Sequence, residues 1–331
     1  IENLNVGNVV EIQWYNKEGE DGSLLKELYG DFGLYIGSHH WRNPGTALVR
    51  QRSKVKSIEG NRVPVSDELI MDMNPDWEPK VTAWEHLEEV GFAHFRMAFP
   101  HSNDFPHHKE AGFNGFFLTR VFNGWVDDVK IENADSGILT EELANVTISN
   151  VETIGTKTAH YTVTMGGVHN VLVKGLTISN RARHPFSFYT YSTRIVFSDC
   201  EVYHDPILDQ LSGAYLQNLF DNIRVHITMD GEMKSYPLFV GGGAGYWKPS
   251  HGSYTTFWNI RALFENGFGI EGPILLNGMG DGPNARLYGV HGNRPVRIEY
   301  GPGAIIKNTN EKPEYPSLFE KQLEQRLENR K

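Results

Sequence analysis

Apolar and polar residues alternate along much of the middle of the chain. The clearest runs lie at residues 144–151, 169–178 and 193–202, where Val, Ile and Thr fill many positions. Alternation with β-branched residues predicts strands that bury one face, whereas a helix would repeat its apolar positions every third or fourth residue. We therefore expect short β-strands through this region.

A short unit recurs within these runs: a small polar residue or glycine, followed by an apolar residue. Five copies are separated by 22 to 25 residues, and three looser copies lie 30 to 37 residues from their neighbours. This repeat predicts a parallel β-helix, in which coils bury their aliphatics against one another and stacked Asn side chains pair as ladders. A leucine-rich repeat would need a regular Leu pattern and a helical segment in each repeat. The copies are Asp128-Val129, Asn150-Val151, Gly175-Leu176, Asp199-Cys200 and Asn222-Ile223, then Gly91-Phe92, Asn259-Ile260 and Gly289-Val290.

Two regions lack the repeat. Residues 7–83 contain short strand-like pieces and turns, which predict a small β-rich insertion. Near the C-terminus, Ser317 can cap an amphipathic helix. The apolar stripe of that helix consists of Leu318, Leu323 and Leu327. The predicted division is a parallel β-helix over 1–6 and 84–310, the insertion over 7–83, and a helix within 311–331 that packs on or caps the solenoid.

Composition narrows the class of protein. The 331 residues are 39% hydrophobic, the mean hydropathy is −0.42, and no apolar run is long enough to cross a bilayer. The net charge of −10 opposes binding to nucleic acid or to an anionic membrane, so a polyanion would need a local basic groove. A single cysteine, Cys200, permits no intrachain disulfide and leaves the redox compartment open. The chain opens at Ile1 inside a strand-like segment, so we expect it to be a piece of a longer protein.

Five phrases of the sequence resemble a known group of proteins, the right-handed parallel β-helix proteins of the pectate-lyase-like superfamily. Within it, they are most similar to a little-characterised bacterial carbohydrate-active group. The resemblance implies an all-β, right-handed parallel β-helix, action on polysaccharide as a lyase, a glycoside hydrolase or a binding module, and a secreted or periplasmic location. The phrases are Gly112–Phe117, Gly124–Val129, Asn133–Ile138, Thr255–Arg261 and Ser317–Leu323.

The sequence departs from the best-known members of that superfamily. The Arg-x-Pro-x-x-Arg stretch of pectate lyases is absent, and its nearest counterpart is Arg181–Pro185. The Gly-His-Gly and Arg-Ile-Lys signatures of polygalacturonases are absent too. Neither mechanism can be transferred residue by residue.

The repeat also predicts which residues can form a catalytic site, because positions about one coil apart become neighbours on one face of a solenoid. The stretch from Lys174 to Arg194 also holds four cations and no Asp or Glu, which predicts a basic patch. β-Elimination on a uronate polymer needs a base, an acid and a cation beside the carboxylate. His160 or Tyr161 can serve as base or acid, and Arg181 or Arg183 as the cation. The predicted catalytic set is His160, Tyr161, Arg181, Arg183, His184, His204, Asp205 and Asp209.

Other interpretations stay open. A glycoside hydrolase would use two carboxylates, with candidates among Asp127, Asp128, Asp199, Asp205 and Asp209. A non-catalytic module would bind carbohydrate without cleaving it. Alternatively, the Arg and His residues at turns simply pair with neighbouring acids.

A glycine-rich stretch, Gly241–Lys248, predicts a loop at the groove edge and not a phosphate loop, because the closing Gly-Lys-Ser/Thr is missing. Aromatic rings in it can stack on a sugar. The predicted substrate-binding residues are Arg194, Tyr215, Tyr246, Trp247, Lys248 and His251.

Histidine doublets occur at His39-His40 and His107-His108, but adjacent histidines lack the spacing of helical zinc sites. We therefore predict no transition-metal site and no cofactor. Calcium bound by oxygen ligands is the one alternative. Its candidate ligands are Asp127, Asp128 and Asp135.

Overall fold

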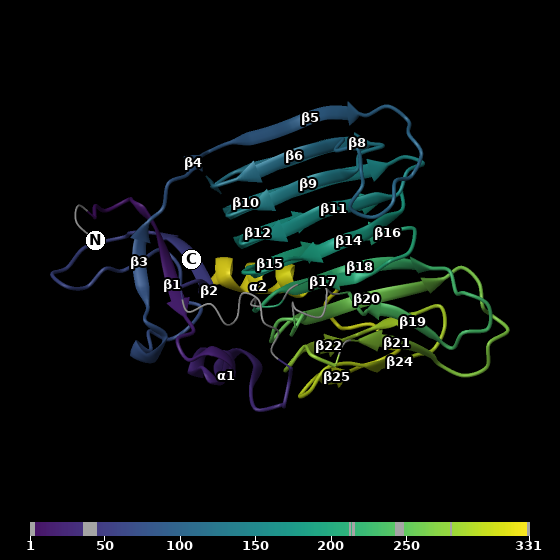
Figure 1. Cartoon of the computed structure of the whole chain (residues 1–331). Coiled ribbons are helices and arrows are strands. Elements are labelled where there is room, and N and C mark those ends of the chain that lie inside the picture. Colours follow the sequence, from purple (N-terminus) through teal and green to yellow (C-terminus); the bar gives the residue numbers. More distant parts are fainter. Residues whose placement is uncertain are drawn as a thin grey trace.

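The structure is a computed structural model that describes residues 4–35, 45–211, 213, 216–241, 248–278 and 280–329. Successive strands stack as coils of a solenoid, with a small sheet beside one edge of it (Figure 1). Every strand pair in the described coils is parallel. The predicted all-β parallel β-helix is confirmed. In the described residues, no helix has the length and apolar character needed to span a membrane.

The coils share three sheets. A long sheet of 14 described strands forms one wall, and sheets of five and three strands form the other. The five-stranded sheet, in the order β17-β14-β11-β9-β6, consists of β6 (Asn114–Thr119), β9 (Ser136–Glu141), β11 (Ala159–Gly166), β14 (Ala182–Phe188) and β17 (Leu208–Gln210). The three-stranded sheet consists of β19 (Ser235–Phe239), β21 (Ile274–Gly278) and β24 (Val296–Glu299).

The long sheet begins with β4 (Leu87–Glu88), β5 (Gly91–Ala98), β7 (Val121–Phe122), β8 (Trp125–Glu132) and β10 (Ala144–Ile154). It continues with β12 (His169–Lys174), β13 (Thr177–Ile178), β15 (Thr193–Ser198), β16 (Glu201–Val202) and β18 (Leu219–Ile227). It ends with β20 (Thr256–Phe264), β22 (Arg286–Tyr288), β23 (His291–Gly292) and β25 (Ile305–Lys307).

The repeat seen in the sequence marks a bend in each coil of the long sheet. The small polar residue or glycine of seven copies has a positive φ, between 50° and 70°, a conformation that Gly, Asn and Asp adopt most readily. Neighbouring bends are joined by side-chain hydrogen bonds: Asn222 Nδ2 donates to Asp199 Oδ1 at 2.6 Å, and Asn259 Nδ2 donates to Asn222 Oδ1 at 2.9 Å. The predicted polar ladder is therefore present along this column.

The first copy of the repeat was misplaced. Gly91 pairs with Trp125, whereas the residue opposite Asp128 is His94, which has the left-handed conformation at φ 59°. The upstream copy is therefore His94-Phe95, and not Gly91-Phe92. The pattern missed it because every other copy has Asn, Asp or Gly at the bend, although histidine also adopts this conformation more readily than most residues.

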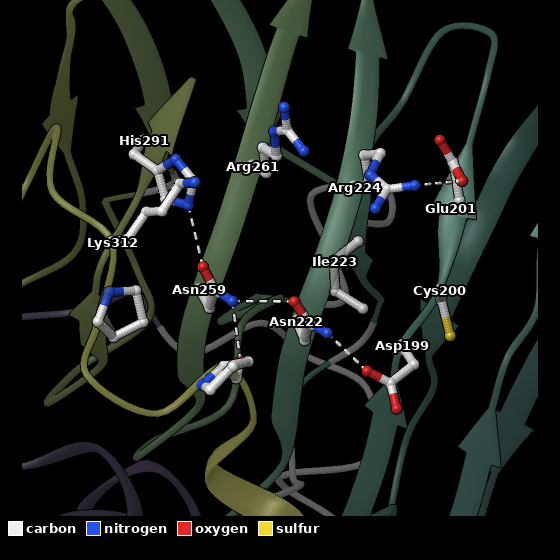
Figure 2. A pocket seen from close by; sticks show the side chains of 12 residues that line it. Asp199, Cys200, Glu201, Asn222, Ile223, Arg224, Asn259, Arg261, His291 and Lys312 are labelled. Carbon is white, nitrogen blue, oxygen red and sulfur yellow. Dashed lines mark hydrogen bonds and ion pairs between the residues drawn. The ribbon is translucent and has the colours of Figure 1, made fainter. Parts of the chain in front are cut away.

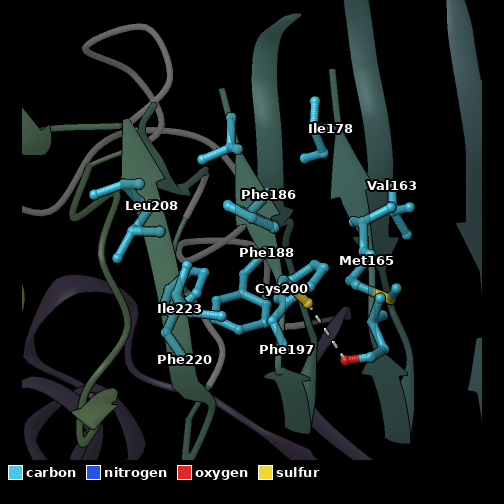
Figure 3. Close-up of a cluster of buried hydrophobic side chains, with 14 of the residues drawn as sticks. Val163, Met165, Ile178, Phe186, Phe188, Phe197, Cys200, Leu208, Phe220 and Ile223 are labelled. Carbon is cyan, nitrogen blue, oxygen red and sulfur yellow. Dashed lines mark hydrogen bonds between the residues drawn. The ribbon is translucent and has the colours of Figure 1, made fainter. Parts of the chain in front are cut away.

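The apolar partner of each repeat points into the coil. These residues form a column whose members are at most 2% exposed: Val129, Val151, Leu176, Cys200, Ile223, Ile260 and Val290. Cys200 fills an aliphatic position, and burial raises the pKa of its thiol to about 12. Beside this column, phenylalanines of successive coils stack (Figure 3): the rings of Phe197 and Phe220 are 5.8 Å apart, and those of Phe220 and Phe257 are 5.2 Å apart.

The N-terminal unit is a sheet in the order β2-β1-β3 with a short helix. A buried arginine ties it to the solenoid: Arg52 pairs with Glu11 of β1 at 2.5 Å, lies 4.9 Å from the Trp84 ring and donates to the Gly167 carbonyl of a coil. Leu4 packs on this unit's core, and the predicted domain boundaries stay a prediction. The elements are β1 (Val9–Tyr15), η1 (Gly19–Asp21), α1 (Ser23–Tyr29), β2 (Ala47–Lys54), η3 (Pro75–Trp77) and β3 (Lys80–Ala83).

The predicted C-terminal helix is α2 (Leu318–Glu328), and Ser317 caps it by accepting from the Glu320 amide at 3.0 Å. The helix docks on the long sheet through its first turn, where the buried Asp221 carboxylate accepts from the Ser317 hydroxyl and from the Leu318 amide. Leu327 remains half exposed. Polar contacts at the N-terminus of the helix, and not the apolar stripe, hold it against the solenoid.

Candidate active site

A 15-residue loop, 99–113, joins β5 to β6 and folds over the end of the five-stranded sheet. Its base is closed by the stacked rings of Phe99 and Phe113, whose centroids are 5.9 Å apart. The buried carboxylate of Asp135 accepts from the amides of Gly112 and Phe113, both at 2.8 Å, and pairs with the buried Lys157. These contacts fix where the loop leaves and re-enters the sheet.

The middle of the loop is also anchored to the sheet. Asp104 accepts from the Thr158 amide at 2.7 Å and from the Thr158 hydroxyl at 3.2 Å. His101 and Thr156 share a hydrogen bond at 3.0 Å. Because residues 156–158 lead directly into β11, the loop is positioned against the start of that strand.

An imidazole cluster lies where the loop meets the sheet. His160 of β11 and His184 of β14 have ring centroids 5.4 Å apart, and the Tyr161 ring is 4.9 Å from that of His184. The loop adds His107 and His108, whose rings lie 4.6 and 5.1 Å from that of His160. Four histidines and a tyrosine thus share one site, and three of these five residues were in the predicted catalytic set.

His184 is oriented by a buried carboxylate. Its Nδ1 lies 2.7 Å from Asp209 Oδ2, and Asp209 is 1% exposed and also accepts from the Ser187 hydroxyl at 3.1 Å. An ionised carboxylate only accepts, so in the neutral imidazole the proton lies on Nδ1 and Nε2 keeps its lone pair. Two members of the predicted catalytic set, His184 and Asp209, are therefore brought together.

Burial keeps His160 and Tyr161 uncharged at neutral pH. Desolvation lowers the pKa of His160 to about 4, even though Glu110 at 3.0 Å from its Nδ1 acts in the opposite direction. Desolvation raises the pKa of Tyr161, and nearby acids including Asp209 raise it further. His160 can thus accept a proton or a metal ion, and Tyr161 can donate a proton.

The four cations of the predicted basic patch have different environments. Lys174 pairs with Glu320 of α2, and Arg181 pairs with Asp205 at 2.6 Å. Arg194, at a bend of the long sheet, donates to the Glu68 carbonyl at 3.1 Å. Arg183 forms no ion pair with any described residue. Burial lowers the pKa of His107, and the charges of His108 and Arg183 lower it further, so Arg183 lies near the imidazole cluster.

Other predicted residues lie apart from the cluster. Asp205 and the exposed His204 share the turn before β17, along the same edge of the sheet as Arg181. Lys248 lies 3.3 Å from Asp281. His251 is fully buried, with Nε2 2.8 Å from the Gly241 carbonyl and Nδ1 2.8 Å from the Tyr300 hydroxyl, so no ring nitrogen is free for a substrate. Outside the described residues lie Tyr215, Tyr246, Trp247 and the doublet His39-His40.

Several of the carboxylates considered for hydrolysis or for calcium are bonded to neighbouring polar groups. Asp127 accepts from Ser149 and Asn150, and Asp128 bonds His94 at 2.9 Å. Asp199 belongs to the polar ladder of the long sheet, as described above. Asp135 is bonded to Lys157 and to the loop amides.

A cavity of about 430 Å³ lies elsewhere, on the long sheet next to the C-terminal segment (Figure 2). Arg224 in it pairs with Glu201 at 2.9 Å, and His291 and Asn259 share a hydrogen bond at 3.0 Å. Arg261 and Lys312 give the cavity a basic edge. We take the imidazole cluster as the candidate site, because an oriented histidine and a protonated phenol lie together there, near a cation that forms no ion pair with any described residue.

The doublet His107-His108 was recognised in the sequence but was not placed with His160, and Glu110 was not predicted as part of the site. Their separation from His160 along the chain is about two coils, so the repeat could not bring them together. The feature of the sequence that pointed to this site was the high proportion of His, Asp and Glu within the loop 99–113.

Comparisons with known proteins leave the family open: no family model and no curated protein matches the chain. Among solved structures, the chain is similar to the tailspike protein gp49 from Pseudomonas phage LKA1, with 13% sequence identity and a TM-score of 0.47. The similarity covers 95% of this chain and 58% of that one, so this chain spans less than two thirds of that protein's length. At this level the likeness carries no argument about function, and the β-helix fold rests on the strand pairing described above.

Proposed function

We propose that this protein is a polysaccharide lyase that cleaves a uronate-containing polymer by β-elimination at the imidazole cluster. The observation that carries the proposal is the His184–Asp209 pair, at 2.7 Å, beside the Tyr161 ring. An outward-facing base and a protonated phenol at adjacent positions are what an elimination requires. An extracellular polymer as substrate agrees with the predicted secreted or periplasmic location.

The proposed reaction begins at the carbon next to the uronate carboxylate. His184 Nε2 removes the proton from that carbon, while Asp209 stabilises the resulting imidazolium through Nδ1. The electron pair left on the carbon forms a double bond to the neighbouring ring carbon, and the glycosidic carbon–oxygen bond breaks. Tyr161 donates its proton to the departing oxygen. The products are a new chain end and an unsaturated uronate, and the protons balance once His184 returns its proton to Tyr161 through solvent.

Arg183 is the proposed partner of the substrate carboxylate. Negative charge builds up on that carboxylate as the proton leaves, and a fixed guanidinium stabilises it. Arg183 is preferred over Arg181 because Arg181 is already paired with Asp205. Because His160 is neutral, it does not repel Arg183. A carbohydrate can therefore bind beside both groups.

Hydrolysis by an acid pair has less support. Asp205 is engaged by Arg181, Asp209 is almost fully buried beneath His184, and Asp199 lies in the other wall of the solenoid. A hydrolase needs two carboxylates that flank one glycosidic bond. Each of these three carboxylates is instead bonded to another side chain of the fold.

The test is incubation of the protein with a panel of uronic, sulfated and neutral polysaccharides, following ultraviolet absorbance and reducing ends together. A lyase raises both signals, because each cleavage creates a conjugated double bond and a reducing end. Reducing ends without absorbance would indicate hydrolysis, and binding without either signal would indicate a non-catalytic module. Both of these outcomes contradict the proposal.

Variants then locate the site. His184→Ala should lower kcat/KM by about 10²–10⁴-fold as the loss of a general base. Arg183→Ala should lower it by about 10²–10³-fold and should cost more than Arg181→Ala. Arg120→Ala, which removes an exposed arginine paired with Glu142, is the matched control and should retain activity. Equal losses in Arg183→Ala and Arg120→Ala would rule out the assigned role of Arg183.

A further inference from the structure

Three imidazoles converge between the loop and β11. The ligand nitrogens of His107, His108 and His160 all lie within 4.8 Å of one another, and no other such trio of His, Cys, Asp or Glu occurs among the described residues. His107 Nε2 and His160 Nε2 are 3.2 Å apart. Two ligands on one tetrahedral zinc ion, each at about 2.0–2.1 Å from it, are separated by about 3.3 Å.

We infer that His107, His108 and His160 form a binding site for a divalent transition-metal ion of the zinc class. Neutral imidazoles suit Zn²⁺, Cu²⁺, Ni²⁺ and Fe²⁺, and three protein ligands leave a coordination position for water or a substrate oxygen. The site is independent of the lyase proposal, because it rests on the ligand geometry alone.

The backbone explains how two adjacent histidines can face the same point. His108 has the left-handed conformation, with φ of 64°, and its ring stacks on that of His107 at 3.9 Å. The turn therefore places both rings on the side of His160, which an extended segment would not do. Adjacent histidines, which the sequence analysis set aside as ligands, thus become compatible with one ion.

A carboxylate supports the ligand that comes from the sheet. Glu110 Oε1 lies 3.0 Å from His160 Nδ1, so the proton stays on Nδ1 and the Nε2 lone pair faces the loop histidines. The same carboxylate accepts from the His108 amide at 3.2 Å and so couples the two halves of the site. A carboxylate behind a metal-binding histidine is the usual arrangement in protein metal sites.

The charges around the site are mixed. Arg183 lies near His107 and opposes a bound cation, while Glu110, bonded to His160, offsets it. The Asp209 carboxylate is shielded by His184, to which it is bonded. A bound divalent ion would therefore keep a net positive charge and attract an anionic ligand to its open position, next to His184 and Tyr161.

The test uses untagged protein that has been treated with a chelator and then titrated with Zn²⁺ by calorimetry and with Co²⁺ by visible absorption. We expect one ion per chain, with Co²⁺ bands typical of a low-coordinate nitrogen site. Affinity should fall by at least about tenfold in His160→Gln and in the double variant His107→Ala/His108→Ala, and by about 10–100-fold in Glu110→Gln.

The matched control is His94→Asn, which removes an exposed, carboxylate-bonded histidine of the long sheet and keeps a residue suited to its positive φ. It should bind metal as the unmodified protein does. Circular dichroism of each variant separates loss of the ion from loss of the fold. Absence of stoichiometric binding in the folded protein would overturn the inference, as would affinity unchanged in His160→Gln. Since neither readout uses enzymatic activity, failure here leaves the lyase proposal untouched, and the reverse also holds.

Discussion

The stacked phenylalanines allow a quantitative test of the solenoid core. Phe220 is fully buried, with Phe197 and Phe257 stacked against it from the adjacent coils and Phe188 at 4.6 Å. Replacing a buried Phe by Ala costs about 3–5 kcal/mol, and the backbone ladders on both sides prevent the coils from collapsing into the space. We therefore expect Phe220→Ala to lower the free energy of unfolding by about 4 kcal/mol.

That loss corresponds to a measurable change in melting temperature. The unfolding entropy is about 2.1 cal/mol/K per residue, or about 0.7 kcal/mol/K for the whole chain, so Tm should fall by about 6 °C in a cooperative transition. Differential scanning calorimetry and urea unfolding measure it. Phe268→Ala removes the same atoms from a side chain that is 63% exposed and should change stability by less than about 0.5 kcal/mol. Equal shifts in the two variants would show that the stack is not a packed core.

Three further predictions concern polar groups. Asp221→Ala removes the acceptor of the Ser317 hydroxyl and the Leu318 amide, so we expect faster proteolytic release of the C-terminal helix, and an unchanged cleavage rate would contradict the docking described here. Asn222→Val should be less stable than Asn222→Gly by about 1–2 kcal/mol in urea unfolding, because only glycine adopts the positive φ freely, and equal stability would argue against strain at this bend. Burial lowers the pKa of His251 in the folded protein, so on acidification the unfolded chain takes up a proton at a higher pH than the folded protein does. Stability should therefore fall as pH drops through about 6.5. His251→Gln should reduce this slope in melting curves recorded between neutral and mildly acidic pH, and an unchanged slope would assign it to other groups.

The fold was readable because the coil bends restrict residue type. Where Asn, Asp or Gly occupied the bend that precedes the buried apolar residue, as at Asn150 and Asn222, the repeat located a strand pair in the correct register. The repeat was placed wrongly at the upstream copy because histidine, and not Asn, Asp or Gly, occupies the bend at His94. A second column of bends also contains Arg194 and Gln217, both with positive φ, and the pattern gave no indication of it. Tertiary contacts, such as that from Arg194 to the Glu68 carbonyl, stabilise residues that the bend alone would disfavour.

In the candidate site, the repeat could predict contacts between equivalent positions of successive coils, but not contacts made by the loop. His184 and Asp209 are separated by about one repeat, so the period brought them together. Nothing periodic connects the loop 99–113 to the sheet, because its position depends on specific contacts of Asp104 and Asp135. The positive charge of the predicted basic patch was overestimated, because the acid that pairs with Lys174 lies 146 residues away in α2 and no repeat connects the two.

The anchoring of the loop 99–113 has an evolutionary consequence. Its base is closed by a ring stack within the loop and fastened to Asp135 of the coils through backbone amides, while His107, His108 and Glu110 contribute side chains to the site. Substitutions at those three positions therefore leave the fastening, and with it the coil register, unaltered. The proposed metal site of this solenoid can therefore diverge between related proteins by exchange of one segment, and the same segment can be transplanted onto another β-helix that offers equivalents of Asp135 and Thr158.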